Sequence, residues 1–245
     1  MKIYAIVQAR TTSTRLPGKV LEEIEGKPMV WHVMNRVLAA ETVDKAVLAF
    51  PDTKENDMIQ MLAEKHLWEY ARGSEDDVLA RYVSALTLFP CDHVVRITAD
   101  CPLADPAIID LVVKEHLESS ADYTSNTLKR DFPRGLDVEV FRVVVLEQAH
   151  REAKQPYARE HVTPYIYEHP EVFLLRSVEA PKALKRPDLR LTVDTKEDLE
   201  LVRAIYGHLY EPGKIFGLQE VIALFHQYPD LKDINAAVKQ KTLGD

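Results

Sequence analysis

Short apolar runs of β type alternate with longer segments of helical periodicity over most of this 245-residue chain. The β-type runs lie at 3–8, 46–50, 93–98, 137–141, 172–178 and 189–193. The helical segments lie at 29–40, 56–66, 76–88, 107–117 and 143–153. Strands separated by helices of this length favour parallel pairing, with the crossing helices packed on the faces of the sheet. The pattern therefore predicts an α/β fold with a mostly parallel sheet sandwiched by helices.

Composition narrows the class of partner. The chain has 39 acidic and 31 basic residues, a net charge of -8, whereas a general nucleic-acid binder is usually basic. We find no apolar run long enough to span a membrane, and the first residues lack the pattern of a signal peptide. The two cysteines, Cys91 and Cys101, match no metal-binding spacing. We therefore expect a cytoplasmic protein without nucleic-acid or membrane partners.

A cation-rich loop follows the first predicted strand. Arg10, Arg15 and Lys19 are spaced five and four residues apart, and Ser13 is one of four hydroxyl-bearing residues between them. Such a loop can wrap a polyphosphate, because backbone N–H groups and hydroxyls bind the oxygens while the cations neutralise the charge. It is not a Walker A loop, whose spacing differs. The alternative interpretation is a solvated basic turn.

Two aspartates follow two other β-type runs. Asp100 comes after the run 93–98, and Asp194 comes after the run 189–193. Ligands of open α/β sheets bind outside the carboxyl ends of the strands, and Mg²⁺ is typically held by one or two carboxylates plus substrate phosphates. Together with the basic loop, this predicts metal-assisted nucleotidyl transfer. The alternatives are an Asx turn at Asp100 and a helix N-cap at Asp194.

A third polar cluster suits a polyhydroxylated ligand. Asp137 and Glu139 share one face of a predicted strand, and carboxylates accept hydrogen bonds from sugar hydroxyls. The alternative is an exposed edge strand. Arg159 and His161 lie in the segment 158–167, which is predicted to be helical; a packed or solvated histidine is the default there.

Three further segments have a less specific pattern. The segment 73–81 resembles a loop and a helix start with Ser74 or Asp76 as the N-cap. The segment 156–180 is predicted to leave the main sheet as an arm. The part from 196 to 241 reads as helices interrupted at 212–213 and 228–229.

Six strings connect these clusters to a known family. They are 8–19 (QARTTSTRLPGK), 73–79 (GSEDDVL), 96–102 (RITADCP), 135–141 (GLDVEVF), 159–165 (REHVTPY) and 192–199 (TVDTKEDL). In this order they resemble the sugar cytidylyltransferases, which include the CMP-Kdo and CMP-sialate synthetases. The resemblance is closest to the SpsF-like branch of spore-coat polysaccharide biosynthesis and reaches to about residue 206.

The resemblance implies a GT-A-like, Rossmann-like fold and a Mg²⁺-dependent reaction. CTP and a sugar, expected to be a sugar acid, would give a CMP-sugar and pyrophosphate for surface polysaccharide synthesis. It also implies a homodimer formed through the arm, and it divides the chain into a nucleotidyltransferase domain, 1–206, and a C-terminal helical extension, 207–245. The Kdo and sialate enzymes differ from this chain at their acceptor motifs, so the sugar cannot be copied from either.

Residue roles follow from the same resemblance. The expected catalytic residues are Arg15, Lys19 and Asp100. The expected metal ligands are Asp100 and Asp194. The expected nucleotide-binding residues are Arg10, Ser13, Arg15, Lys19, Ser74, Asp77 and Arg81. The expected sugar-binding residues are Asp137, Glu139, Arg159 and His161. The alternatives are a GT-A-type glycosyltransferase using a nucleotide-sugar, a nucleotidyltransferase using another NTP, and a non-enzymatic nucleotide-binding protein.

Overall fold

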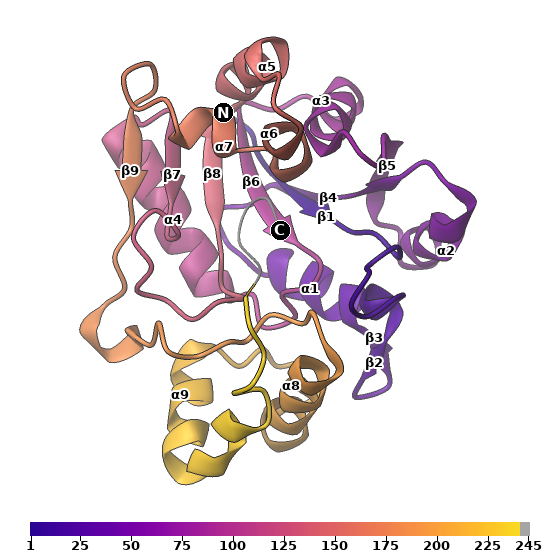
Figure 1. The fold of residues 1–245 in the computed structure, drawn as a ribbon, viewed down its shortest axis with the longest axis vertical. Coiled ribbons are helices and arrows are strands. Elements are labelled where there is room, and N and C mark those ends of the chain that lie inside the picture. The colour runs from indigo at the N-terminus through magenta and orange to yellow at the C-terminus, as the bar shows by residue number, and fades with distance from the viewer. Residues whose placement is uncertain (241–245) are drawn as a thin grey trace.

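The computed structural model describes residues 1–240 of the chain. Within this part, the strands form a seven-stranded sheet in the order β5-β4-β1-β6-β8-β7-β9 (Figure 1) and a separate two-stranded ribbon. In chain order the sheet strands are β1 (Ile3–Gln8), β4 (Lys45–Pro51), β5 (Glu69–Gly73), β6 (His93–Thr98), β7 (Tyr123–Ser125), β8 (Glu139–Arg142) and β9 (Leu175–Ser177). Neighbouring strands are parallel except at β8, which is antiparallel to both β6 and β7. The predicted, mostly parallel sheet is therefore confirmed.

Helices cover both faces of this sheet, as predicted (Figure 1). One apolar core contains residues of α1 (Met29–Val37), α2 (Asp57–His66), α4 (Pro106–Ser119), α8 (Lys196–Leu209) and α9 (Leu218–Gln227). The second core contains residues of α3 (Val78–Leu88), α5 (Val143–Glu152), α6 (Pro156–His161) and α7 (Pro164–Tyr167). The short elements are η1 (Lys19–Leu21), η2 (Lys54–Asn56), η3 (Lys182–Leu184), η4 (Pro229–Asp233) and the ribbon of β2 (Glu23–Ile24) and β3 (Lys27–Pro28).

The register of the central strands places their carboxyl ends at one edge. Gln8, the last residue of β1, pairs with Ala49 of β4 and with Thr98, the last residue of β6. The interior of β1 is apolar and buried, as expected for a strand covered on both faces. The loops that follow β1 and β6 therefore emerge side by side, where ligands of open α/β sheets bind.

Two strands of the sheet were not predicted, and one predicted strand is absent. β5 and β7 were missed because β5 is a mixed-polarity edge strand and β7 has only three residues. The run 189–193 is not a strand of either sheet; its only ladder contact is an isolated bridge between Arg190 and Arg134. Its apolar residues are buried in the core, which explains why the run resembles a strand.

The predicted arm does not leave the sheet. β9 pairs in parallel with β7 and forms one edge of the main sheet. Val162, Ile166 and Phe173 are almost fully buried against α3 and α5 of the same chain. Their burial within one chain removes the reason, drawn from the sequence, to pack the whole segment against a partner.

The C-terminal helices share a core with the sheet. Phe216 and Phe225 belong to the same apolar cluster as the helices α1 and α4. The buried Arg36 side chain donates hydrogen bonds to the backbone oxygens of Ala104 and Phe216, which ties α1 to the segment before α9. The division at residue 206 stays a prediction. Among residues 1–240, no helix combines the length and apolar character needed to cross a membrane.

Candidate active site

The loop between β1 and η1 folds back on itself. Gly18 has a φ of 71°, in the left-handed region that favours glycine, and its N–H donates to the backbone oxygen of Thr11 at 2.8 Å. The fully buried Asn56 side chain accepts a hydrogen bond from the Thr11 N–H at 3.0 Å. These contacts close the loop and direct the next residue, Lys19, into the protein.

The Lys19 ammonium lies between two carboxylates. It donates to Asp100 Oδ2 at 2.7 Å, to Asp194 Oδ1 at 2.8 Å and to the Val193 oxygen at 2.8 Å. Burial alone would lower the pKa of Lys19, but the two carboxylates outweigh it and raise that pKa. Burial would likewise raise the pKa of Asp100, yet the charge and hydrogen bond of Lys19 lower it to about 2. Lys19 and Asp100 are therefore both ionised at neutral pH and form a buried ion pair.

Backbone hydrogen bonds hold the two aspartates next to each other. The Val193 N–H donates to the backbone oxygen of Asp100 at 2.8 Å, and the Thr192 hydroxyl donates to the same backbone oxygen at 3.2 Å. The segment before Asp194 thus lies against the end of β6 without joining the sheet. Asp194 is not the N-cap of α8, because Thr195 takes that place in a capping box with Asp198.

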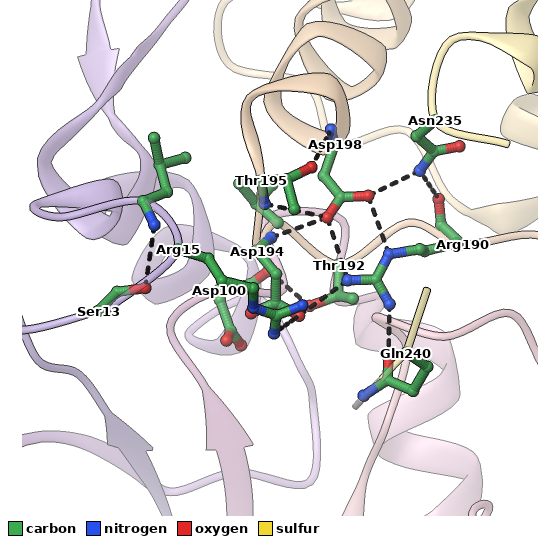
Figure 2. A network of polar contacts seen from close by, with 12 residues as sticks. Ser13, Arg15, Asp100, Arg190, Thr192, Asp194, Thr195, Asp198, Asn235 and Gln240 are labelled. Atoms are coloured by element: carbon green, nitrogen blue, oxygen red, sulfur yellow. Dashed lines mark hydrogen bonds and ion pairs between the residues drawn. The ribbon is translucent and has the colours of Figure 1, made fainter. Parts of the chain in front are cut away.

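Arginine side chains extend the ion cluster (Figure 2). Asp194 Oδ2 is 2.8 Å from an Nη2 atom of Arg15 and 2.8 Å from Nη2 of Arg190. Arg190 also contacts Asp198 through Nε at 2.9 Å, and the Asp198 side chain is fully buried. With Lys19 and Asp100, the cluster contains three cations and three carboxylates, so its charges balance.

The other predicted residues of the first loop face elsewhere. Arg10 is about half exposed and lies 3.9 Å from Glu160 at the surface. The Ser13 hydroxyl accepts a hydrogen bond from the Leu16 N–H at 3.5 Å, within the loop. The Thr12 hydroxyl donates to Glu75 at 2.6 Å, which links the loop to the segment 73–81.

The segment 73–81 is held by its own polar residues. Asp77, rather than Ser74 or Asp76, is the N-cap of α3, with its carboxylate accepting from the Ala80 N–H at 2.9 Å. The Ser74 hydroxyl accepts a hydrogen bond from the Asp77 N–H, and the backbone oxygen of Ser74 accepts one from the Arg81 guanidinium. Arg81 is buried, and burial lowers its pKa to about 10.

A cavity of about 430 Å³ lies over β6 and β8. It is lined by Arg96, Thr127, Leu128, Arg130, Asp137, Glu139, His161, Thr163 and Tyr167. Three of the four residues expected to bind a sugar therefore meet in one cavity. The fourth, Arg159, does not line it; its guanidinium contacts Asp77 at 2.6 Å and the backbone oxygen of His150 at 3.0 Å.

Charge pairs organise the walls of the cavity. Arg130 forms a bidentate ion pair with Asp137, in which Nη1 donates to Oδ1 at 2.7 Å and Nη2 donates to Oδ2 at 2.9 Å. Glu139 is buried, pairs with Arg96 and accepts a hydrogen bond from the Tyr123 hydroxyl at 2.8 Å. Burial lowers the pKa of His161, so its imidazole is neutral at physiological pH.

The cavity borders the ion cluster. Burial, followed by the charges of Asp100 and Asp137, raises the pKa of the Cys101 thiol, and the Cys101 Sγ atom lies 3.6 Å from Asp100 Oδ1. Arg96, in the cavity wall, is on the same strand that leads to Asp100. A basic loop, a pair of carboxylates and a polar cavity thus adjoin one another at the carboxyl edge of the sheet. A family model described as cytidylyltransferase matches residues 4–227.

The chain belongs to the cytidylyltransferase family. Spore coat polysaccharide biosynthesis protein SpsF of Bacillus subtilis is 33% identical over 93% of this chain and 95% of its own length. An 8-amino-3,8-dideoxy-manno-octulosonate cytidylyltransferase of Shewanella frigidimarina is 28% identical over 85% of this chain and 88% of its own. A solved cytidylyltransferase of Leptospira borgpetersenii superposes with a TM-score of 0.90, at 29% identity, over 99% of both chains. Membership makes this protein a nucleotidyltransferase, as the sequence motifs predicted.

Sequence reasoning missed several polar residues of this cytidylyltransferase. Arg190 and Asp198 belong to the ion cluster, and Arg96 and Arg130 to the cavity. Two signals were available. Arg96 interrupts an otherwise apolar strand, and Arg190 precedes Asp194 and Asp198 by four and eight residues. Charged residues inside apolar runs are rarely buried without a partner, so each such charge indicates an internal ion pair.

Proposed function

We propose that this chain is a Mg²⁺-dependent enzyme that transfers CMP from CTP to a sugar acid, releasing pyrophosphate, for surface polysaccharide synthesis. The observation that carries the proposal is the meeting of Asp100 and Asp194 at one ammonium group, at the end of a cation-rich loop. Family membership supports the cytidylyl part, and the names of the Bacillus and Shewanella relatives support the sugar acid and the polysaccharide.

The two carboxylates fit a divalent cation. Asp100 and Asp194 present hard oxygen atoms within 2.8 Å of a single positive charge, that of Lys19. Among residues 1–240 no cluster of three or more His, Cys, Asp or Glu side chains could hold a metal. A pair of carboxylates suits Mg²⁺, which binds one or two carboxylates and completes its shell with water and substrate phosphates. When bound, Mg²⁺ would neutralise charge on the phosphates.

The loop cations would bind the triphosphate. In the reaction, a sugar oxygen attacks the α-phosphorus of CTP, the new O–P bond forms, and the bond to the β-phosphate oxygen breaks. The hydroxyl proton leaves to solvent, and pyrophosphate carries away the negative charge. Lys19 and Arg15 would neutralise this charge, and Arg10 would approach from the surface. Catalysis by positioning and charge neutralisation is the usual pattern for phosphoryl-transfer enzymes.

The cavity would hold the acceptor sugar. Asp137 and Glu139 accept hydrogen bonds, whereas Arg96 and Arg130 offer donors for a carboxylate or hydroxyl. His161 adds a neutral ring. The segment 73–81, linked to the loop through Thr12 and Glu75, would flank the nucleotide through Ser74, Asp77 and Arg81. In this proposal Arg159 acts by fixing Asp77 rather than by contacting the sugar.

A pyrophosphate-release assay tests the proposed reaction. Purified protein, Mg²⁺ and each of the four NTPs are mixed with a panel of ulosonic acids and neutral sugars. The expected result is release with CTP and a sugar acid, abolished by EDTA. Release with UTP and a neutral sugar would replace CTP and the acid in the proposal. The proposal would be contradicted if no pair released pyrophosphate while the protein hydrolysed a CMP-sugar or transferred its sugar.

We also propose that the protein is a cytoplasmic homodimer. Within residues 1–240, β9 is a three-residue strand at an edge of the sheet, and the nearby Val172 and Leu174 are 52% and 58% exposed. Exposed apolar residues beside an open strand edge favour association. Light scattering should give twice the chain mass of 27.9 kDa, and Leu174→Glu should give a monomer. A wild-type mass of one chain at every concentration would exclude the dimer.

A further inference from the structure

The end of the described chain returns to the ion cluster. Residues 234–240, here named the tail segment, follow η4 and lie beside Arg190 (Figure 2). The Asn235 side chain is 6% exposed and donates to Asp198 Oδ1 at 2.8 Å and to the Arg190 backbone oxygen at 3.1 Å. Gln240 accepts a hydrogen bond from the Arg190 guanidinium. This segment lies beyond residue 227, where the family model ends.

Asp198 connects the tail segment to Asp194. Its Oδ2 atom accepts hydrogen bonds from the backbone N–H groups of Asp194 and Thr195, at 3.0 and 3.2 Å. Its Oδ1 atom accepts from Asn235 and from Arg190 Nε. Arg190 in turn donates from Nη2 to Asp194 Oδ2 at 2.8 Å. The backbone and the side chain of Asp194 are therefore both fixed by groups that contact the tail segment.

The remaining partners of the Asp194 carboxylate belong to the cation-rich loop between β1 and η1. Lys19 and Arg15 are the cations that the proposed reaction draws toward the triphosphate. Arg190 is one-tenth exposed and bound to Asp198, so it stays in place when those cations change partners. A buried carboxylate that has lost its partners is costly, which makes the remaining guanidinium decisive for its orientation.

We propose that the tail segment is a positioning device for Asp194, with Arg190, Asp198 and Asn235 as positioning residues. The proposal rests on the proposed function in one respect, the role of Asp194 as a ligand of the divalent cation. Partners of this kind orient a metal-binding carboxylate without touching the metal, and their loss typically weakens metal affinity about tenfold to a hundredfold. The C-terminal part of the chain thereby acquires a role in the chemistry.

The test compares Asn235→Ala with Lys239→Ala, a control at an exposed position of the same segment. Hydrogen exchange of the free protein reports the Asp194 and Thr195 N–H groups directly, with no ligand. Electron paramagnetic resonance then measures Mn²⁺ binding in the presence of CTP. Pyrophosphate release over a range of Mg²⁺ concentrations gives the metal requirement and the KM for CTP separately.

We expect Asn235→Ala to speed exchange at Asp194 and Thr195, to weaken Mn²⁺ binding about tenfold and to raise the Mg²⁺ requirement by a similar factor. The KM for CTP at saturating Mg²⁺ should stay near the wild-type value, and Lys239→Ala should match wild type throughout. Arg190→Lys keeps the positive charge but loses the planar guanidinium that contacts Asp194 and Asp198 together. It should act in the same direction. It provides an independent variant in case Asn235→Ala fails to fold.

Two results would overturn the proposal. Unchanged exchange at Asp194 and Thr195 would show that the tail segment does not fix this turn. Faster exchange and a lower Tm with unchanged Mn²⁺ affinity would reduce the segment to a stabilising role. Failure of the proposed function gives a different pattern: wild-type protein would neither bind Mn²⁺ with CTP nor release pyrophosphate, and exchange at the two N–H groups would still decide whether the tail segment fixes the turn.

Discussion

At the scale of single residues, the active site depends on charges whose partners come from distant parts of the sequence. Lys19 could be selected from the sequence because it ends a cation-rich loop after the first apolar run, and Asp100 and Asp194 because each follows an apolar run closely. Arg190 and Asp198 were missed, because their spacing indicates an ion pair but does not show that the segment 189–198 folds against β6. From the sequence the N-cap of this helix was expected at Ser74 or Asp76, whereas the backbone places it at Asp77.

Replacing Lys19 should have the largest effect among the loop residues. Lys19→Met removes a preorganised positive charge from the proposed triphosphate site, so kcat/KM should fall by about a hundredfold or more. The matched control is Lys27→Met, at an exposed position of the β2–β3 ribbon. Steady-state kinetics with both variants provide the comparison. Equal kcat/KM values for wild type and Lys19→Met would remove Lys19 from the mechanism.

Asp194 and Thr195 are neighbours with separable functions. Asp194→Asn should abolish metal-dependent turnover while circular dichroism shows a folded protein, because Asp194 does not cap α8. Thr195→Ala should lower the free energy of unfolding by about 1 kcal/mol through loss of the N-cap. Pyrophosphate release and urea unfolding of both variants separate the two effects. Normal turnover by Asp194→Asn at ordinary Mg²⁺ would contradict its role as a ligand.

At the scale of elements, two histidines join β6, α4 and β7. His93 Nδ1 lies 3.0 Å from His116 Nε2, and His116 Nδ1 lies 2.9 Å from the Thr124 hydroxyl. His116 is 1% exposed. Burial, with smaller contributions from His93 and Arg142, lowers the pKa of His116 from 6.5 to about 4. The three elements therefore meet through an imidazole that has to stay neutral.

This pairing predicts acid sensitivity of the fold. As pH falls below 6.5, the unfolded chain takes up a proton on His116, whereas the folded chain does so only near pH 4. The free energy of unfolding should therefore decrease across this window, by up to about 3 kcal/mol at about 1.4 kcal/mol per pKa unit. Urea unfolding at both ends of the window measures the decrease. His116→Gln should flatten it, and an unchanged slope in that variant would assign the decrease to other groups.

The elements differ in how well their sequence predicts them. The helices α1 to α5 and the strands β1, β4 and β6 have long periodic or apolar patterns, and all were predicted close to their observed bounds. β5 is a mixed-polarity edge strand and β7 has only three residues, too few for a periodic signal, so the pairing of both depends on tertiary contacts. The run 189–193 has the apolar character of a strand because it packs on the core, which composition alone cannot distinguish from sheet pairing.

At the scale of the whole molecule, the C-terminal helices complete one apolar core. Leu218, Val221, Ile222, Leu224 and Phe225 of α9 are each less than one-tenth exposed. A chain that ends at residue 206 would expose the surfaces that these side chains cover. At roughly 1.5–3 kcal/mol for each large apolar side chain, the loss is comparable to the whole stability of a domain.

A truncated chain of residues 1–206 is therefore expected to be insoluble or to lack cooperative unfolding. Calorimetry and near-UV circular dichroism of the truncated and full chains make the comparison. A sharp unfolding transition of the truncated chain, close to the wild-type Tm, would instead establish 1–206 as an independent domain. The sequence suggested that division because the recognisable family motifs end there. Such motifs indicate functional residues and do not indicate where an apolar core ends.

The cavity and the ion cluster are built from largely separate stretches of chain. The cavity walls come from residues 96–167, whereas the charge cluster comes from the first loop, Asp100 and the segment 190–198. Mutations that alter the cavity can thus accumulate without disturbing the ion cluster, which is proposed to bind the triphosphate. Over evolutionary time, a lineage with this architecture can exchange one acceptor for another while its nucleotide chemistry is inherited unchanged.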